Sequence, residues 1–462
     1  FSGAFGLRDV ERGLSADSRT LYQIASCTKA FTAALAAMLV EEGALDWDAP
    51  VRDYVPEVRF HDDYATRTVS VRDLLCHRTG LPRHEYSWYG TDYTRDDIIH
   101  NLRFLEPNRP IRTTFQYNNQ CYVLAGRVLE RLTGTTFEEL VSRRILEPLG
   151  MRRSRLYVDE LTEDRNHAVG YGRPDGRDPV HGRVPIPYYK SSVEDRSAGV
   201  GSPFAPAGCI SSCVDDLLVW ARLHLGDDSA PADVLSPAAL ATLHAPQTIL
   251  DRPLDMPQDE SCFHCYGLGW FVESYRGRRL VKHSGNIDGF SSFVGLLPDE
   301  DLGVVALTNM NGSLLHVALA HEVLDHHLGV SGGDWVGRYH EYAVEKGGRE
   351  AEMAARLRGE RVLGTAPSHA PADYAGTYAR PGYEQVRVTC DAGALTLDFN
   401  HWRLPLDHFH YDTFVLDDVL GELPPGMPVH FHLAETGGSI DGLAMPLHTE
   451  PGCDLVRFRR VG

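Results

Sequence analysis

The spacing of apolar residues predicts that the first half of the chain is built mainly from helices. Helix-forming residues fill positions 30–42 and 120–132. Each run closes on a glycine, a common helix stop because glycine adopts left-handed backbone angles without steric cost. From about residue 48 to 225 the pattern indicates helices and loops with few strands. A Pro/Gly-rich excursion at 170–208 is typical of a pocket wall or lid, and we expect substrate-defining loops there.

Alternating apolar and polar residues predict strands at both ends of this region. We expect one antiparallel sheet from residues 4–10, 20–24, 266–275, 279–283, 290–297 and 303–308. In such a sheet the N-terminal strands lie beside those near residue 300, so the two segments meet at one site. The predicted fold class is therefore α+β, an antiparallel sheet flanked by helices and accompanied by an all-helical subdomain.

The period of the pattern changes once more towards the C-terminus. A helical segment at 335–358 leads to a proline-bearing linker at 365–371, after which apolar residues alternate at 386–388, 395–399 and 429–433. Short alternating runs with turn residues between them predict an antiparallel β-barrel. We therefore divide the chain into residues 1–330, a helical linker at 331–370 and a barrel at 371–462.

The first chemical signal is Ser26, which Lys29 follows by one helical turn at the start of the run 30–42. A serine nucleophile needs a base within hydrogen-bond reach, and a lysine kept neutral by desolvation can serve as one. Alone, the pair fits a serine helix cap beside a solvated lysine at least as well. Further motifs have to decide between the two interpretations.

A second motif, Tyr117 and Asn119, stands just ahead of the helical run 120–132. Residues two apart in an extended or turn segment point the same way. The tyrosine is then placed for proton transfer and the amide for holding a substrate amide. The alternative is a core tyrosine beside an N-cap asparagine.

The third motif is His283-Ser284-Gly285, at the end of the predicted strand 279–283. A strand edge that ends in a small residue and a glycine lets a substrate backbone lie alongside it like a further strand. Without the other two motifs, a structural histidine in a hairpin would be the better explanation.

In this order the three motifs resemble the serine-dependent class C β-lactamase and penicillin-binding-protein superfamily. That superfamily includes D-aminopeptidases, D-Ala-D-Ala carboxypeptidases, esterases and acyltransferases. The surrounding segments 74–82, 148–151 and 266–270 are similar to it too, and the resemblance covers about residues 1–330. The C-terminal region, opening at 374–378, resembles the lipocalin-like barrel of some members. Its role would be that of a structural appendage, a cleft wall or an oligomer contact.

The resemblance implies a role for each motif residue. Ser26 would be acylated, Lys29 would accept its proton, and Tyr117 would pass that proton to the leaving group. The backbone N–H groups of Ser26 and Asn286 would form the oxyanion hole. No metal or cofactor is implied. The residues implied for substrate binding are Asn119, Ser284, Gly285 and Asn286.

His283 joins the implied catalytic residues at a position where β-lactamases and carboxypeptidases commonly carry lysine. A histidine is mostly neutral near pH 7 and anchors a substrate carboxylate less well than a permanent cation. Lys282 cannot substitute, because neighbouring residues on a strand face opposite ways. Since the peptidase and esterase branches carry histidine here, the resemblance favours peptides with a free amine, esters or thioesters over β-lactams.

Composition narrows the possible partners. With 462 residues, 43% of them hydrophobic and 24% charged, the chain is an ordinary globular one with room for two domains. A formal net charge of −19 disfavours nucleic acid and anionic membranes, so a small-molecule or peptide substrate fits better. The longest apolar stretch, residues 30–40, is too short to span a membrane. The sequence leaves the oligomeric state open.

Nine cysteines, several in helical or apolar contexts, indicate buried thiols and favour a cytoplasmic location. The chain begins at Phe1 within a predicted strand, so we expect a missing upstream segment, and a signal peptide stays open. Cys262 and Cys265 have zinc or redox spacing without a second ligand pair. His321 and His326 miss the zinc-protease spacing by one position. We therefore predict no metal site.

Three functions compete. The leading one is a serine hydrolase that forms an acyl-enzyme on Ser26 with peptide, amide or ester substrates, of the D-residue peptidase or esterase type. The same acyl group could pass to an amine in an acyltransferase or a stand-alone nonribosomal-peptide cyclase of the penicillin-binding-protein-type thioesterases. A non-catalytic penicillin-binding sensor would be favoured by a missing motif member, and none is missing.

Overall fold

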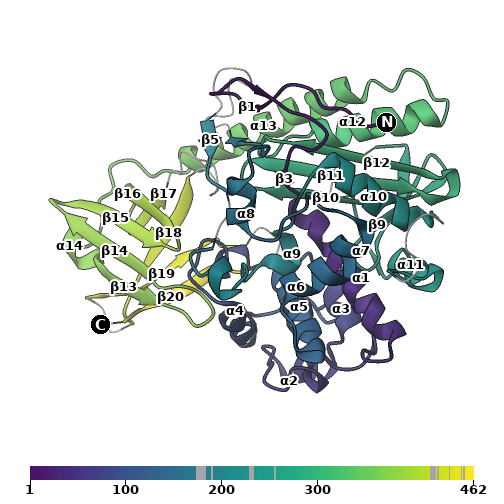
Figure 1. Ribbon diagram of the computed structural model, residues 1–462. Helices are drawn as coiled ribbons and strands as arrows, with labels where there is room; N and C mark the ends of the chain where they lie inside the picture. The colour runs from purple at the N-terminus through teal and green to yellow at the C-terminus, as the bar shows by residue number, and fades with distance from the viewer. Residues whose placement is uncertain are drawn as a thin grey trace.

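The computed structural model describes most of the chain. The described residues are 1–461 without 173–183, 189–190, 228–233, 254–255, 257, 417–422, 424–425, 436–437, 449 and 451–452. Much of the predicted excursion at 170–208 therefore lies outside the described residues. Figure 1 shows a larger body of helices and sheet with a separate barrel at its side.

One six-stranded antiparallel sheet forms the middle layer of the larger body, in the order β12-β11-β10-β9-β8-β7. Helices α12 (Leu315–His327) and α13 (Trp335–Gly359) cover one face, and α1 (Thr28–Glu41) and α10 (Val214–Leu225) cover the other. All eight residues of β11 are buried, as expected for a strand covered on both faces. The strands are β7 Thr248–Ile249, β8 Ser261–Tyr266, β9 Phe271–Tyr275, β10 Arg278–Ile287, β11 Phe290–Leu297 and β12 Leu302–Thr308.

The N-terminal strands do not join this sheet, so that part of the prediction is wrong. β1 (Leu7–Asp9) pairs with β2 (Leu14–Ser15), and β3 (Tyr22–Gln23) pairs with β6 (Ser211–Ser212). Strands of two or three residues carry too little alternation to specify a partner, and β3 is held beside β6 by the hydrogen bond from Ile24 N to Ile210 O, 2.9 Å long.

Two strand boundaries also differ from the prediction. Residues 266–275 form two strands, because Gly267 N donates to Trp270 O over 2.7 Å and Gly269 has a positive φ of 81°, which closes a turn. β10 continues past the His-Ser-Gly motif to Ile287 and turns into β11 at Gly289. The motif therefore lies within a strand and not at its end.

Helix α1 runs through the centre of the larger body, and twelve of its fourteen residues are buried. Its sequence is apolar all round, with five alanines among residues 30–37, so the helix can be packed on every side. Helix α5 (Asn119–Thr133) packs against it and ends at Gly134, whose φ of 69° confirms the predicted stop. The other helices of this all-helical part include α2 Asp63–Thr68, α3 Val71–Leu75, α4 Arg95–Asn101, α6 Phe137–Val141 and α9 Ala205–Gly208.

The C-terminal region is a closed eight-stranded antiparallel barrel, as predicted. Alternation places Val386 and Val388 inside and Arg387 outside. The barrel packs on the loop before α4, where the Asn400 side chain donates to the carbonyl oxygens of Tyr86 and Tyr89 over 2.9 and 2.7 Å. Its strands are β13 Gly376–Ala379, β14 Val386–Asp391, β15 Ala394–Phe399, β16 Trp402–His410, β17 Thr413–Leu416, β18 Met427–Leu433, β19 Ile440–Met445 and β20 Val456–Val461.

No helix among the described residues combines the length and the apolar character that crossing a membrane requires.

Gly285→Ala is expected to lower the free energy of unfolding by about 1–3 kcal/mol, because overpacking at a tight contact forces backbone shifts. A Cβ at this position would lie 2.3 Å from Ile24 O and 3.0 Å from Ala25 Cβ. Urea denaturation measures the change. Gly347→Ala is the control, since its Cβ would meet nothing within 4 Å and the helix gains propensity. Equal effects of the two substitutions would contradict the contact argument.

Candidate active site

Ser26 lies in a single 3-10 turn, Ala25–Cys27, that leads directly into α1. The turn is held from outside, because the Ser292 side chain of β11 donates to Ile24 O over 2.7 Å and Cys27 Sγ lies 3.3 Å from His283 O. Ala25 has a φ of 47°, an uncommon conformation for a residue with a Cβ. Such strain next to a reactive side chain is typical of functional sites.

Lys29 is fully buried one turn further along, and its Nζ lies 3.0 Å from Ser26 Oγ and 2.7 Å from Ala207 O. Burial, followed by the nearby charge of Arg83, lowers the pKa of Lys29 well below its usual value. An amine that is neutral at ordinary pH can accept the proton of the serine hydroxyl. The geometry thus places the hydroxyl of Ser26 and the amine of Lys29 in hydrogen-bond contact.

Tyr117 lies beside Ser26 and Lys29, with its ring centroid 4.8 Å from Lys29 Nζ. Burial raises the pKa of Tyr117 far above its usual value, although a hydrogen bond with Ser26 and the charge of Arg83 act in the opposite direction. The phenol is therefore protonated. It is placed to donate a hydrogen bond or a proton to a group bound at Ser26.

Asn119 is buried at the first position of α5, and Asn118 caps that helix by accepting from Cys121 N over 3.0 Å. The Asn119 side-chain nitrogen donates to Glu85 Oε1 over 3.2 Å. Its Oδ1 is buried without a hydrogen-bond partner among the described residues. A buried acceptor left unpaired is costly, so it is suited to an N–H group that a ligand would bring.

The third motif supplies the strand beside Ser26. Pairing of β10 with β9 ends at Lys282, and from Ser284 to Asn286 the strand pairs with β11 on one edge and borders the cavity on the other. Gly285 packs against the turn of Ser26, where a side chain would clash. This edge is open to an extended ligand backbone.

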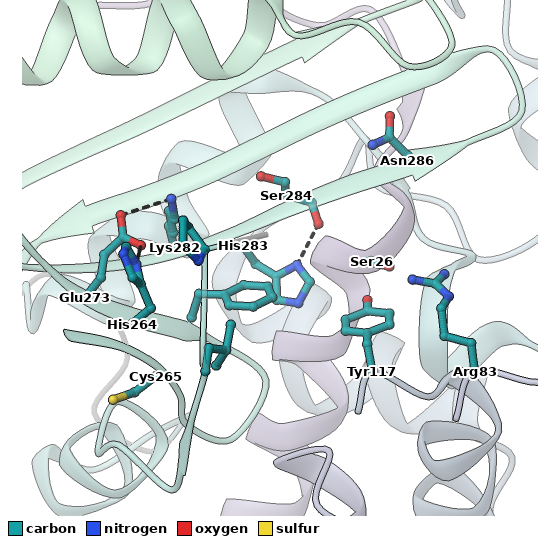
Figure 2. A pocket seen from close by; sticks show the side chains of 13 residues that line it. Ser26, Arg83, Tyr117, His264, Cys265, Glu273, Lys282, His283, Ser284 and Asn286 are labelled. Carbon is teal, nitrogen blue, oxygen red and sulfur yellow. Dashed lines mark hydrogen bonds and ion pairs between the residues drawn. The ribbon is translucent and has the colours of Figure 1, made fainter. Parts of the chain in front are cut away.

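The two hydrogen bonds of the His283 ring fit a neutral imidazole, with one nitrogen donating and the other accepting. Its Nδ1 lies 2.6 Å from the carbonyl oxygen of Ser284, so this nitrogen carries a proton. Its Nε2 lies 3.0 Å from the hydroxyl of Tyr266, which can donate to it. Figure 2 shows the ring between β10 and Tyr117, whereas Lys282 points towards Glu273.

These residues surround a cavity of about 240 Å³. Lys29 lies behind Ser26, and neither Asn119 nor Gly285 lines the cavity wall. Several of the lining residues have no signal in the sequence, because their partners are distant in the chain. None of the described residues of the 170–208 excursion lines the cavity. The lining residues are Ser26, Arg83, Tyr117, Leu250, Pro253, His264, Cys265, Phe271, Glu273, Lys282, His283, Ser284 and Asn286.

One end of the cavity holds a buried charge cluster. Glu273 lies 3.0 Å from Lys282 Nζ and 3.0 Å from His264 Nδ1. Burial opposes ionisation of Glu273, but Lys282 and His264 outweigh it and lower the pKa of this carboxyl to about 2. The ammonium of Lys282 is thus engaged with a carboxylate.

Among the described residues, one group could hold a metal ion, formed by His448, Glu450 and Cys453 of the barrel, whose ligand atoms all lie within 4.8 Å of one another. It does not line the Ser26 cavity. Cys262 is exposed, and all nine cysteines are free thiols, five of them buried.

The fold and the site define a class, the β-lactamase-like and penicillin-binding-protein-like serine hydrolases. Residues 1–328 match the family described as Beta-lactamase, and residues 360–460 match a domain of unknown function, DUF3471. The chain belongs to the β-lactamase family.

Relatives and solved structures agree with this assignment. The chain is 30% identical over 397 residues to unguisins hydrolase ungD' of Aspergillus campestris, covering 80% of this chain and 69% of the relative. It is similar in fold to the octameric penicillin-binding protein homologue from Pyrococcus abyssi, with a TM-score of 0.61, 23% identity, and coverage of 99% and 92%. D-amino acid amidase from Ochrobactrum anthropi SV3 gives a TM-score of 0.52 and 25% identity, with coverage of 70% and 87%.

The rate at which a fluorophosphonate labels the protein is expected to rise with pH and to level off well below pH 10.5. The neutral amine of Lys29 exists only above its pKa in the folded protein, and burial lowers that pKa. Intact-mass spectrometry over a pH series measures the rate. Lys29→Arg, which stays protonated, should label slowly at every pH. A wild-type rate still rising at pH 10.5 would show that Lys29 is charged at neutral pH.

Proposed function

We propose that this protein hydrolyses amide bonds of small peptide-like substrates through an acyl-enzyme on Ser26. The observation that carries the proposal is the buried Lys29 amine 3.0 Å from Ser26 Oγ. Burying a lysine ammonium is costly because the charge loses its hydration. A buried lysine beside a serine is therefore best explained by a role for its neutral amine.

In the proposed reaction Ser26 Oγ attacks the substrate carbonyl carbon while its proton passes to Lys29 Nζ. The carbonyl oxygen becomes an oxyanion, which the backbone N–H groups of Ser26 and Asn286 would stabilise. The proton then moves by way of Tyr117 to the leaving amine, and the C–N bond breaks. In the second half a water molecule attacks the ester carbonyl carbon and gives a proton to Tyr117 and Lys29. The bond to Ser26 Oγ then breaks, Ser26 takes back the proton, and the acid leaves.

Asn119 and the edge of β10 would orient the substrate. The unpaired Oδ1 of Asn119 offers an acceptor for a substrate N–H, and the strand from Ser284 to Asn286 offers backbone groups. Amides carry both kinds of partner, whereas simple esters lack the N–H. The names of two similar proteins, a hydrolase of unguisins and a D-amino acid amidase, favour the same substrate class.

Transfer of the acyl group to an amine, as in an acyltransferase or a peptide cyclase, shares every step up to the acyl-enzyme. The likeness to SurE, at 22% identity, supports the fold alone. Product analysis with and without an added amino acid distinguishes the two outcomes, since water gives a free acid and an amine gives a new amide.

Ser26→Ala is expected to abolish fluorophosphonate labelling and to reduce turnover by at least about 10³-fold, because the group that forms the covalent bond is gone. Ser197→Ala is the matched control, since Ser197 lies in an exposed 3-10 turn, Arg196–Ala198, outside the cavity. Intact-mass spectrometry reports labelling and thermal denaturation reports folding. Labelling of folded Ser26→Ala protein at the wild-type rate would refute the acyl-enzyme assignment.

Nitrocefin is expected to be a poor substrate, with kcat/KM below the range of about 10⁴–10⁸ M⁻¹s⁻¹ that efficient enzymes reach. The reason is that His283, held as a neutral ring, replaces the cation that would bind the β-lactam carboxylate. Steady-state kinetics on nitrocefin and on the D and L forms of phenylalanine amide measure the preference. Efficient nitrocefin hydrolysis together with inert amides would overturn the proposed substrate class.

A further inference from the structure

Arg83 lines the cavity at the end opposite the Lys282 cluster, on the far side of Ser26 from His283 (Figure 2). Its guanidinium carbon lies 5.0 Å from the ring centroid of Tyr117, and Lys29 Nζ lies 4.8 Å from the same centroid. The side chain of Arg83 is 38% exposed. A ligand bound at Ser26 therefore has direct access to a permanent cation.

The barrel fixes the backbone of this arginine. Arg83 N donates to Glu450 Oε1 over 3.0 Å, and the next residue, His84, places its Nδ1 2.8 Å from the hydroxyl of Tyr383. His84 has a φ of 46°, so the turn needs such support. Two barrel residues thus clamp the segment that carries Arg83 into the cavity.

The side chain of Arg83 is held by one edge only. Its Nε donates to Glu85 Oε2 over 3.1 Å, and Glu85 also accepts from Asn119. The two terminal nitrogens have no hydrogen-bond partner among the described residues. Paired N–H groups of this geometry match a carboxylate in a bidentate arrangement.

The other basic groups of the cavity are already engaged. Lys282 and His264 contact Glu273, and Lys29 contacts Ser26 and the carbonyl oxygen of Ala207. His283 sits in a network suited to a neutral ring. The cation that a lysine at position 283 would provide is thus missing on that side of Ser26, and Arg83 provides one on the other side.

We propose that Arg83 is the anion-binding residue of the Ser26 cavity, positioned by Glu450 of the barrel, and that the preferred substrate presents a carboxylate to it. This inference rests on the proposed function for its placement of the substrate at Ser26. It adds the chemical class of a substrate group and a role for the barrel in recognition.

The test uses phenylboronic acids, which bond reversibly to an active serine, carrying a carboxylate or the matching carboxamide at the ortho, meta or para position. Competition with fluorophosphonate labelling gives each inhibition constant. In the wild-type protein at least one carboxylate-bearing compound should bind about tenfold tighter than its carboxamide counterpart. Such a ratio is the scale of a hydrogen bond to a charged group. Arg83→Met should abolish this ratio, and Arg83→Lys should keep part of it.

Two controls separate recognition from structure. Arg109→Met removes an exposed arginine outside the cavity and should leave the acid-to-amide ratio unchanged. Glu450→Ala should reduce the ratio by releasing the clamp, whereas Asp441→Ala, which removes an exposed barrel carboxylate, should not. Melting temperatures show that each variant is folded.

The result that would overturn the proposal is a wild-type protein without preference for any acid, or a preference that survives Arg83→Met. Failure of the acyl-enzyme assignment looks different, because the wild-type protein would then not be labelled at Ser26 at all. Failure of the proposed amide class alone appears as inert amides with Ser26 still labelled. Calorimetric titration of the same acids and amides into Ser26→Ala protein measures the preference without a bond to serine. If neither calorimetry nor the competition series shows tighter binding of a carboxylate than of its carboxamide, Arg83 is not the anion-binding residue.

Discussion

The burial of the Lys29 amine against Ser26 is the interaction on which the rest of the structure depends. Burial favours the neutral form of a lysine, and the helix that carries Lys29 runs through the middle of the domain, where this side chain is fully buried. The alanine-rich α1 allows this burial, because small side chains let the sheet and the helical part approach closely. Gly269 and Gly285 also allow close approach, since a Cβ on Gly269 would collide with the backbone of α1 and one on Gly285 with the Ser26 turn.

The parts of the site that the sequence predicts are those that depend on local spacing. Ser26 and Lys29 stand one helical turn apart, and Tyr117 and Asn119 stand at the entry of a helix whose glycine stop is visible in the sequence. The pattern of apolar residues predicted the fold class, and the barrel could be recognised from its period of two. The roles of the site residues and the division of the chain at residues 330 and 370 stay predictions.

The features of the site and fold that the sequence does not reveal depend on contacts between distant residues. Arg83 directly follows a segment that resembles the family, but its partner Glu450 lies 367 positions away, and no local pattern joins them. Glu273 and Lys282 are neighbours only through the register of β9 and β10. The N-terminal strands were misplaced for a related reason, since two or three alternating residues cannot identify a partner strand.

The charged side chains of the cavity lie at its two ends, with Ser26 between them. A permanent cation at position 283 would lie on the other side of Ser26 from Arg83. At that end of the cavity Glu273 accepts from Lys282 and His264. With a neutral ring at position 283, the guanidinium of Arg83 becomes the cation nearest to Tyr117, and the same charge helps to lower the pKa of Lys29. The backbone N–H of Arg83 donates to Glu450 of the barrel, and Glu450 does not line the cavity. Under the proposal that Arg83 binds a substrate carboxylate, one residue would serve both substrate recognition and the pKa of Lys29.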